Sequence, residues 1–344
     1  MQIKLNPAEL KTKLNIVNNC LDSGIPHQIL TGVLIKTCKN SIHLTTTNLE
    51  VVIKTKLMGN FEEDGEILVP CATLNSIISK LDSKECILET KDNKLIVRQG
   101  KLKFNIGLLD KEEFPKIKKI NWIDIGKGKI KIIRNSLFAS QEAISSGNQI
   151  LYSLFFDKDK IIATDSTRLI ISKINPLKES FLLPFPTALL LSNIFDEYKV
   201  FLSEEKDKVL FSNGETLLQS SLIDGEYVNY KNVIPKNKFK FSIKKTNLIL
   251  LLERAMIIDI DLTEFIITKD KIIVKSNSKV SSYEEEIKSN FTGKELKIKF
   301  NPKYLLDFLN IYNDEIITLE VDGSEKPILI KGKEIIYLFL PMRV

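Results

Sequence analysis

Two carboxylates, Asp259 and Asp261, have the residue type and spacing that come nearest to a metal site. Carboxylate oxygens are suitable ligands for Mg²⁺, and a bound Mg²⁺ would activate water for hydrolysis. In most proteins, however, two acidic side chains in such a loop are simply solvated and bind no metal. The second interpretation is favoured, so we expect no metal and no cofactor. A metal-dependent hydrolase using Asp259 and Asp261 stays open as the alternative from another functional class.

Histidine is too scarce for most acid–base sites. The chain contains only His27 and His43, which excludes a multi-histidine metal site and disfavours a Ser-His-Asp triad. The polar run Asp165–Arg168 has no histidine near it in sequence, so we expect a polar turn after a strand. Phosphate-binding, H-E-x-x-H and G-x-S-x-G motifs are absent from the sequence. These observations together argue against an enzyme.

The composition is that of a water-soluble globular chain. Of its 344 residues 43% are hydrophobic and 27% charged, and the net charge of +6 is weak evidence for a polyanionic partner. The four cysteines lack C-x-x-C spacing and indicate reduced, mostly buried thiols. We find no signal peptide and no apolar run of transmembrane length. We therefore expect a cytoplasmic protein with no membrane contact.

The chain repeats a hairpin that ends in a Thr/Ser–Asn/Asp step. The three copies end at Thr47-Asn48, Thr164-Asp165 and Ser276-Asn277, about one third of the chain apart. A second signal has half that period, because six segments look like a strand end followed by a helix. The repeats predict three similar domains, each built from two copies of one helix-plus-strands unit. The helical segments begin near Leu5, Val69, Ile132, Leu183, Phe241 and Phe300.

Short sequence motifs predict where helices begin and where hairpins turn. Asn6-Pro7 and Asn301-Pro302 put an N-cap acceptor before a proline at the helix start. Asp92-Asn93 and Asn213-Gly214 are typical of tight hairpins. Antiparallel strands with helices on one face give an α+β fold. We expect domains at 1–121, 122–240 and 241–344, with a linker turn at Gly126-Lys127-Gly128.

Motifs along the whole chain resemble one family, the bacterial DNA polymerase III beta subunit, or sliding clamp. Each motif is weak alone, but together their order and spacing make a specific match. The marks are Ala163–Leu169 (ATDSTRL), Leu222–Tyr227 (LIDGEY), Val233–Asn237 (VIPKN), Phe300–Leu306 (FNPKYLL) and Leu340–Val344 (LPMRV).

The resemblance implies a ring. In this family three domains form half of a closed ring, two chains join head to tail, and helices line a hole around duplex DNA. Such a processivity factor has no catalysis of its own and attracts phosphates without reading bases. The helix of Thr187–Phe195 has no basic residue, so its part of the hole should attract DNA weakly. The DNA-facing candidates are Lys11, Lys13, Lys80, Arg254 and Lys303.

The resemblance also implies a hydrophobic pocket that takes short peptides from the polymerase III catalytic subunit, the clamp loader and other clamp-binding proteins. Strand alternation places Phe339 in the core and leaves Leu340 and Met342 for this pocket. Departures from the family pattern at Ser166, Thr167, Val228 and Asn232 indicate a shifted peptide preference. The expected pocket residues are Leu151, Thr164, Arg168, Leu169, Val233, Asn301, Tyr304, Leu338, Leu340, Pro341, Met342 and Arg343.

Family correspondence places the dimer contact between the first and third domains. Basic residues of one edge would face a glutamate run on the other, with an apolar part between them. A monomeric clamp-like scaffold that binds peptides but does not close a ring stays open as a third hypothesis. The interface candidates are Lys94, Arg98, Lys101, Lys103, Phe104, Ile106, Ile257, Ile258, Glu284, Glu285 and Glu286.

Overall fold

The computed structural model describes residues 1–21, 27–38, 41–82 and 84–342. All six predicted helices are present, and two of them begin at the predicted Asn-Pro caps. The Asn6 side chain accepts a hydrogen bond from the Ala8 N–H at 2.8 Å, and Asn301 accepts one from the Lys303 N–H at 2.9 Å. The helices are α1 (Pro7–Asn18), α2 (Cys71–Ile78), α3 (Ile130–Ser136), α4 (Phe185–Ile194), α5 (Lys245–Ile258) and α6 (Pro302–Ile311).

The strands pair antiparallel throughout the described sheets, which confirms the α+β prediction. They are β1 (Gln2–Leu5), β2 (Gly32–Cys38), β3 (Ser41–Thr47), β4 (Val51–Met58), β5 (Asn60–Phe61), β6 (Gly65–Pro70), β7 (Cys86–Lys91), β8 (Lys94–Gln99), β9 (Leu102–Gly107), β10 (Trp122–Lys129), β11 (Ser153–Asp157), β12 (Lys160–Thr164), β13 (Arg168–Lys173), β14 (Phe181–Pro184), β15 (Glu197–Ser203), β16 (Lys208–Ser212), β17 (Thr216–Ser221), β18 (Phe239–Lys244), β19 (Thr263–Ile267), β20 (Lys271–Asn277), β21 (Ser282–Lys288), β22 (Leu296–Phe300), β23 (Ile316–Val321), β24 (Ile328–Lys331) and β25 (Ile335–Phe339).

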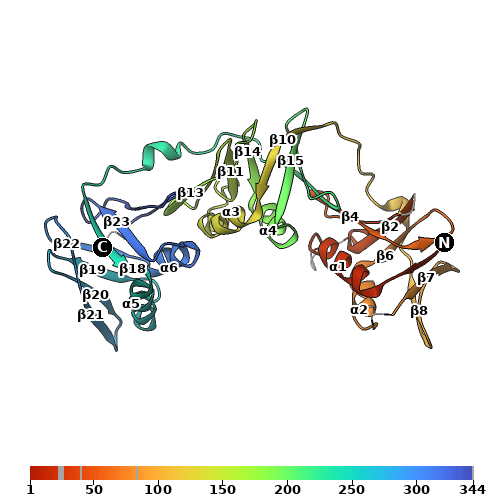
Figure 1. Ribbon diagram of the computed structural model, residues 1–344, viewed down its shortest axis with the longest axis horizontal. Coiled ribbons are helices and arrows are strands. Elements are labelled where there is room, and N and C mark those ends of the chain that lie inside the picture. Colours follow the sequence, from red (N-terminus) through yellow and green to blue (C-terminus); the bar gives the residue numbers. More distant parts are fainter. Residues whose placement is uncertain (22–26, 39–40, 83, 343–344) are drawn as a thin grey trace. The chain divides into compact units, whose positions relative to one another are not determined.

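Contacts divide the chain into two compact units, and the first combines Met1–Ile130 with Leu189–Leu222. It holds a five-stranded sheet in the order β5-β1-β7-β8-β9 and an eight-stranded sheet in the order β10-β15-β16-β17-β4-β3-β2-β6. Helices α1 and α2 contact each other and lie side by side beneath strands β2, β4 and β6 (Figure 1). Strand β9 is last in the order of the five-stranded sheet and forms one edge of it.

The second unit combines Lys131–Ala188 with Ile223–Val344. Its eight-stranded sheet has the order β14-β11-β12-β13-β25-β24-β23-β18, and its four-stranded sheet the order β21-β20-β19-β22. Helices α5 and α6 contact each other and lie side by side near β18 (Figure 1). Strand β21 forms one edge of the smaller sheet. The predicted limits at 121 and 240 do not coincide with the limits of these units and stay a prediction.

The sequence repeat is visible at the level of single hydrogen bonds. The Thr47 hydroxyl donates to the Val51 carbonyl at 2.8 Å, and the Thr164 hydroxyl donates to the Arg168 carbonyl at 2.6 Å. Two residues after each threonine the backbone is left-handed, with φ of 79° at Leu49 and 78° at Ser166. The first two copies therefore build the same turn. In the third copy the Ser276 hydroxyl donates elsewhere, to the carbonyl of Leu262.

The prediction of a linker turn at Gly126-Lys127-Gly128 is wrong, because these residues lie inside β10. A bulge between Asp124 and Gly126 shifts the register, and Gly126 has a φ of 147°. A Cβ at Gly128 would lie 2.6 Å from the Tyr198 hydroxyl oxygen. Both glycines thus serve a bulge and a close approach within a sheet rather than a turn.

The four cysteines are free thiols, as predicted. Cys20, Cys71 and Cys86 are buried, and Cys38 is half-buried. Burial raises the pKa of Cys20 and Cys86 to about 11 and that of Cys71 to about 12. These thiols are packing residues of the first unit.

Candidate functional site

A pocket of about 290 Å³ opens in the second unit, beside the end of β25 and the turn between β12 and β13. Pairing of β13 with β25 puts Arg168 opposite Phe339 and Leu169 opposite Leu338. A third wall comes from the segment that contains the short 3-10 helix η5 (Tyr230–Val233). The lining residues are Leu151, Thr164, Ser166, Thr167, Arg168, Leu169, Val228, Asn229, Tyr230, Val233, Pro327, Leu338 and Leu340.

The structure brings together part of the predicted pocket set. Leu151, Thr164, Arg168, Leu169, Val233, Leu338 and Leu340 all line the pocket. Asn301 instead caps α6, and Tyr304 lies with its ring centroid 4.8 Å from the Arg168 guanidinium.

The chain end follows the predicted alternation only as far as the strand extends. Phe339 is buried and its ring lies 5.4 Å from that of Phe300, whereas Leu338 and Leu340 line the pocket. Strand β25 ends at Phe339, and neither Pro341 nor Met342 lines the pocket. Strand alternation therefore gives no position for Met342, and its place in the pocket stays a prediction. Arg343 lies outside the described residues.

Sequence reasoning did not assign the residues of the η5 segment to the pocket, apart from Val233. Tyr230 is buried, its hydroxyl donates to Asp157 at 2.7 Å, and Tyr227 stacks on Phe155 with ring centroids 5.1 Å apart. Burial and the bond to Asp157 raise the pKa of Tyr230 well above its usual value. These contacts fix the segment as a wall. The pocket lining shares Leu169, Tyr230 and Leu338 with a buried apolar cluster, which also contains Ile162, Ile171 and Leu329.

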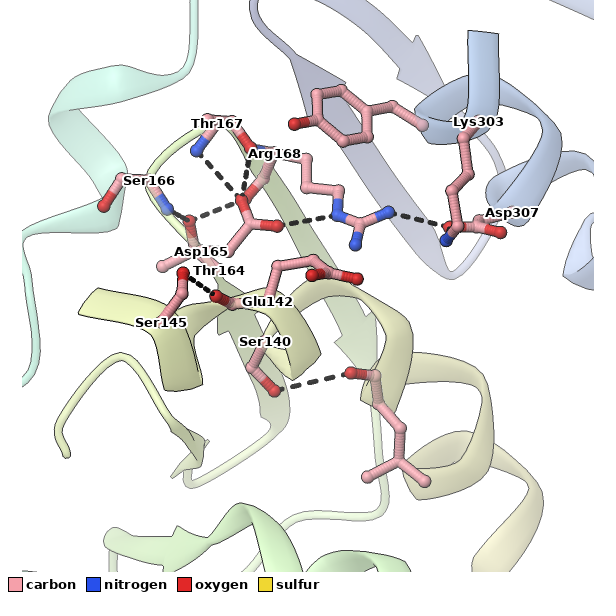
Figure 2. Close-up of polar contacts among 12 residues, drawn as sticks. Ser140, Glu142, Ser145, Thr164, Asp165, Ser166, Thr167, Arg168, Lys303 and Asp307 are labelled. Atoms are coloured by element: carbon pink, nitrogen blue, oxygen red, sulfur yellow. Dashed lines mark hydrogen bonds and ion pairs between the residues drawn. The ribbon is translucent and has the colours of Figure 1, made fainter. Parts of the chain in front are cut away.

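The Asp165–Arg168 run forms a polar turn, as predicted, and it also anchors a buried arginine (Figure 2). One Asp165 oxygen accepts hydrogen bonds from the backbone N–H of Thr167 at 2.9 Å and of Arg168 at 3.0 Å. The other oxygen lies 2.8 Å from Arg168 Nε. On the opposite side, Arg168 Nη1 lies 2.8 Å from Asp307 of α6. An acidic side chain of α6 therefore binds this buried guanidinium.

The predicted DNA-facing cations fall into two groups. Lys11 and Lys80 are exposed. The other three form ion pairs: Lys13 with Glu215 at 2.8 Å, Arg254 with Glu285 at 2.6 Å, and Lys303 with Asp307 at 2.7 Å. Because each carboxylate cancels much of its partner's field, these three contribute less attraction for DNA than their number indicates.

The basic and apolar candidates for the dimer contact lie on or beside the edge strand β9. Phe104 is 36% exposed, and Leu102, which sequence reasoning missed, lies two residues before it on the same face and is also exposed. Ile106 is only 4% exposed, so it packs inside its own unit and is unavailable to a partner. Of the remaining candidates, Lys94 on β8, Lys101 before β9 and Lys103 on β9 are exposed, whereas Arg98 on β8 is half-buried and pairs with Glu89 at 3.4 Å.

The acidic candidates lie on the edge strand β21 and already have partners. Glu284 pairs with Lys275 at 2.7 Å, Glu285 with Arg254 at 2.6 Å and Glu286 with Lys271 at 2.7 Å. On the neighbouring helix α5, Ile257 is 81% exposed and Ile258 is half-buried. The apolar part of this surface is therefore available, whereas its negative charge is largely neutralised within the chain.

The alternative metal site lacks a sufficient set of ligands. One Asp259 oxygen accepts the backbone N–H of Asp261 at 2.9 Å and of Leu262 at 3.1 Å, and Asp261 accepts a bond from the Asn301 amide at 3.4 Å. Across the described ranges, no group of three or more His, Cys, Asp or Glu side chains is placed to hold a metal ion. The two acids are turn-forming residues, and the hydrolase hypothesis has no support.

Comparison with known proteins agrees with this geometry. The family model described as the N-terminal domain of the DNA polymerase III beta subunit matches residues 1–118, and the C-terminal domain model matches residues 228–343. A beta sliding clamp of Staphylococcus aureus (strain Mu50 / ATCC 700699) is 24% identical over 363 aligned positions, covering 96% of each chain. The one of Staphylococcus epidermidis is 25% identical and covers 96% of this chain and 97% of its own.

Solved structures share the fold. The sliding clamp of Bacillus subtilis superimposes with a TM-score of 0.92 at 24% identity, covering 100% of this chain and 99% of its own. The clamp of Bartonella birtlesii bound to griselimycin gives a TM-score of 0.93 at 23% identity, with both chains covered completely. Among the described residues, no helix has the length and apolar character that crossing a membrane requires. The two domain models together match more than half of the sequence, and the chain belongs to the DNA polymerase III beta subunit family.

Proposed function

We propose that this chain is a DNA sliding clamp, a processivity factor with no catalytic activity of its own. The observation that carries the proposal is the match of the entire chain to clamp structures, with a TM-score of 0.92 over its full length. Family membership and clamp relatives that align over 96% of the chain support it further. Of the two alternatives, a hydrolase has no ligand set, and a monomeric scaffold has no feature that favours it over a ring.

The proposed ring is a head-to-tail homodimer of chains with three domains each, divided near residues 121 and 240. The edge of β9 in one chain would meet the edge of β21 in the next, where each strand offers backbone groups that no strand of its own sheet pairs. Such a heterologous contact closes when two copies complete the rotation. Because Glu284 and its neighbours are already ion-paired, burial of Phe104 and Ile257 would supply most of the affinity.

The proposed hole holds duplex DNA by weak, sequence-independent attraction. Lys11 and Lys80 are exposed, while Lys13, Arg254 and Lys303 share their charge with acids. A small net attraction releases few counterions and therefore permits movement along the duplex. Retention would then come from the closed ring rather than from phosphate contacts.

The pocket of the second unit is the proposed docking site for peptides of the polymerase III catalytic subunit, the clamp loader and other clamp-binding proteins. Leucine and aromatic side chains fit its apolar lining of Leu169, Val233, Leu338 and Leu340, part of which belongs to a buried apolar cluster. The Bartonella birtlesii clamp was solved bound to griselimycin. We propose that griselimycin also binds this chain and that it occupies the pocket of the second unit. A replication protein of this kind is expected in the cytoplasm.

A labelled peptide with leucine and phenylalanine anchors tests the pocket. Fluorescence anisotropy should show saturable binding, displaced by griselimycin. Val233→Asp should weaken binding at least about tenfold, because it places a charge in the apolar site at a side chain that is 50% exposed and thus tolerates the change. The matched control, Val280→Asp, alters an exposed valine outside the pocket lining and should bind normally. Equal affinities for the two variants would contradict the site.

A further inference from the structure

Arg168 lines the pocket and is the largest fully buried side chain among the described residues. Its side chain is 1% exposed, and its guanidinium joins Asp165 and Asp307, each at 2.8 Å. The same group lies 5.4 Å from the ring centroid of Phe138 and 4.8 Å from that of Tyr304. Two carboxylates and two aromatic rings therefore hold this cation in one position.

The four partners of the guanidinium are not among the residues that line the pocket. Figure 2 shows the guanidinium pointing from the Asp165 turn toward Asp307 and Lys303 of α6. Asp307 and Phe138 are absent from the pocket lining, whereas Ser166 and Thr167, in the turn that Arg168 closes, belong to it. The arginine thus joins the turn at the lip of the pocket to a helix behind it.

We propose that Asp307 is a positioning residue for peptide binding and acts through Arg168. This inference rests on the proposed docking site and extends it to a residue that no peptide would touch. With the Asp307 charge removed, Arg168 keeps its ion pair with Asp165, on its own turn, and its two ring contacts, but the turn loses its ion pair to α6 and is left there with the ring of Tyr304. The lip at Ser166 and Thr167 and the end of β25, where the Leu340 N–H donates to the Thr167 carbonyl at 2.8 Å, would then lose their fixed geometry.

The chain supplies a closely matched control. Asp307 pairs with Lys303, four residues earlier, at 2.7 Å, and Asp322 pairs with Lys326, four residues later, also at 2.7 Å. Both carboxylates lie in the second unit and are mostly covered, but of the two it is Asp307 that also binds a buried arginine. Comparison of Asp307→Asn with Asp322→Asn therefore separates loss of the arginine contact from loss of an acid paired with a lysine.

The experiment measures anisotropy of the labelled leucine–phenylalanine peptide together with the melting temperature of each variant. We expect Asp307→Asn to weaken binding about tenfold, Asp307→Glu to restore it to within about threefold of wild type, and Asp322→Asn to leave it within about twofold. Phe138→Leu, which removes one ring from the guanidinium, should weaken binding about threefold and decides the question if Asp307→Asn does not fold.

Wild-type affinity in folded Asp307→Asn, or a lower melting temperature with unchanged affinity, would overturn the inference while leaving the docking site intact. Equal losses in Asp307→Asn and Asp322→Asn would overturn it as well, because the arginine contact would then be irrelevant. A wild-type chain that does not bind the peptide contradicts the proposed function itself, and the inference falls with it.

Discussion

A chain carrying both Phe104→Ala and Ile257→Ala is expected to sediment as a monomer at micromolar concentration. Phe104 is 36% and Ile257 81% exposed, on surfaces that a head-to-tail dimer would bury. Burying a fully exposed large apolar side chain contributes about 1.5–3 kcal/mol, and because Phe104 is already largely covered in the free chain, each contact would lose about 2–3 kcal/mol. A closed ring of two chains contains two such contacts, so both weaken at once. Each interface should lose at least about thirtyfold in affinity.

Two exposed apolar residues outside the proposed contact provide the control. Met58 at the end of β4 and Ile316 at the start of β23 are both exposed, and Met58→Ala with Ile316→Ala should sediment as the wild type does. Sedimentation velocity over a dilution series measures both double variants. A Phe104/Ile257 variant that remains dimeric at the lowest concentration would contradict this interface.

Removal of Leu340–Val344 is expected to abolish peptide binding and to leave the dimer intact. Strand β25 ends at Phe339, so its ladder with β13 and β24 survives the deletion. The pocket loses Leu340, one of its apolar walls. Anchors of this kind typically contribute about 2 kcal/mol or more, which is about thirtyfold in affinity. The proposed ring contacts on β9 and α5 are not touched.

A shorter truncation separates Leu340 from the residues after it. Removal of Met342–Val344 keeps Leu340 and should cost much less affinity, because Met342 does not line the pocket. Calorimetric titration of the peptide and sedimentation of the same samples measure both properties. A folded dimer that lacks Leu340–Val344 but binds the peptide normally would disprove the assignment of the tail.

Features set by short-range interactions could be predicted from the sequence. Asn6 and Asn301 cap their helices as expected, because an N-cap needs only its own backbone two residues later. Asp92 and Asn93 form the tight turn between β7 and β8 with φ of 50° and 56°. The polar turn at Asp165 follows from the same local chemistry.

Features that depend on tertiary contacts could not be predicted from the sequence. The bond between Arg168 and Asp307 joins residues 139 positions apart, and nothing in the spacing of α6 distinguishes Asp307 from a solvated acid. Ile106 lies on the same strand face as Phe104, yet its own unit covers it. Gly126 and Gly128 resemble a turn in the sequence. In the structure a bulge requires glycine at the first position and a close approach to Tyr198 requires it at the second, and the sequence shows neither. Leu340 directly follows β25 and lines the pocket, whereas Met342 lies two residues further on, where strand alternation no longer predicts the direction of a side chain.

Retention on DNA of different topology tests the clamp proposal most directly. The labelled protein is loaded by a clamp loader onto a nicked circle and isolated at moderate salt, and half of the sample is then linearised with a restriction enzyme. A closed ring held by topology should stay on the intact circle and leave the linear DNA within minutes, whereas phosphate binding alone would depend on salt and not on ends. Equal retention on circular and linear DNA would contradict the proposal that this chain encircles the duplex.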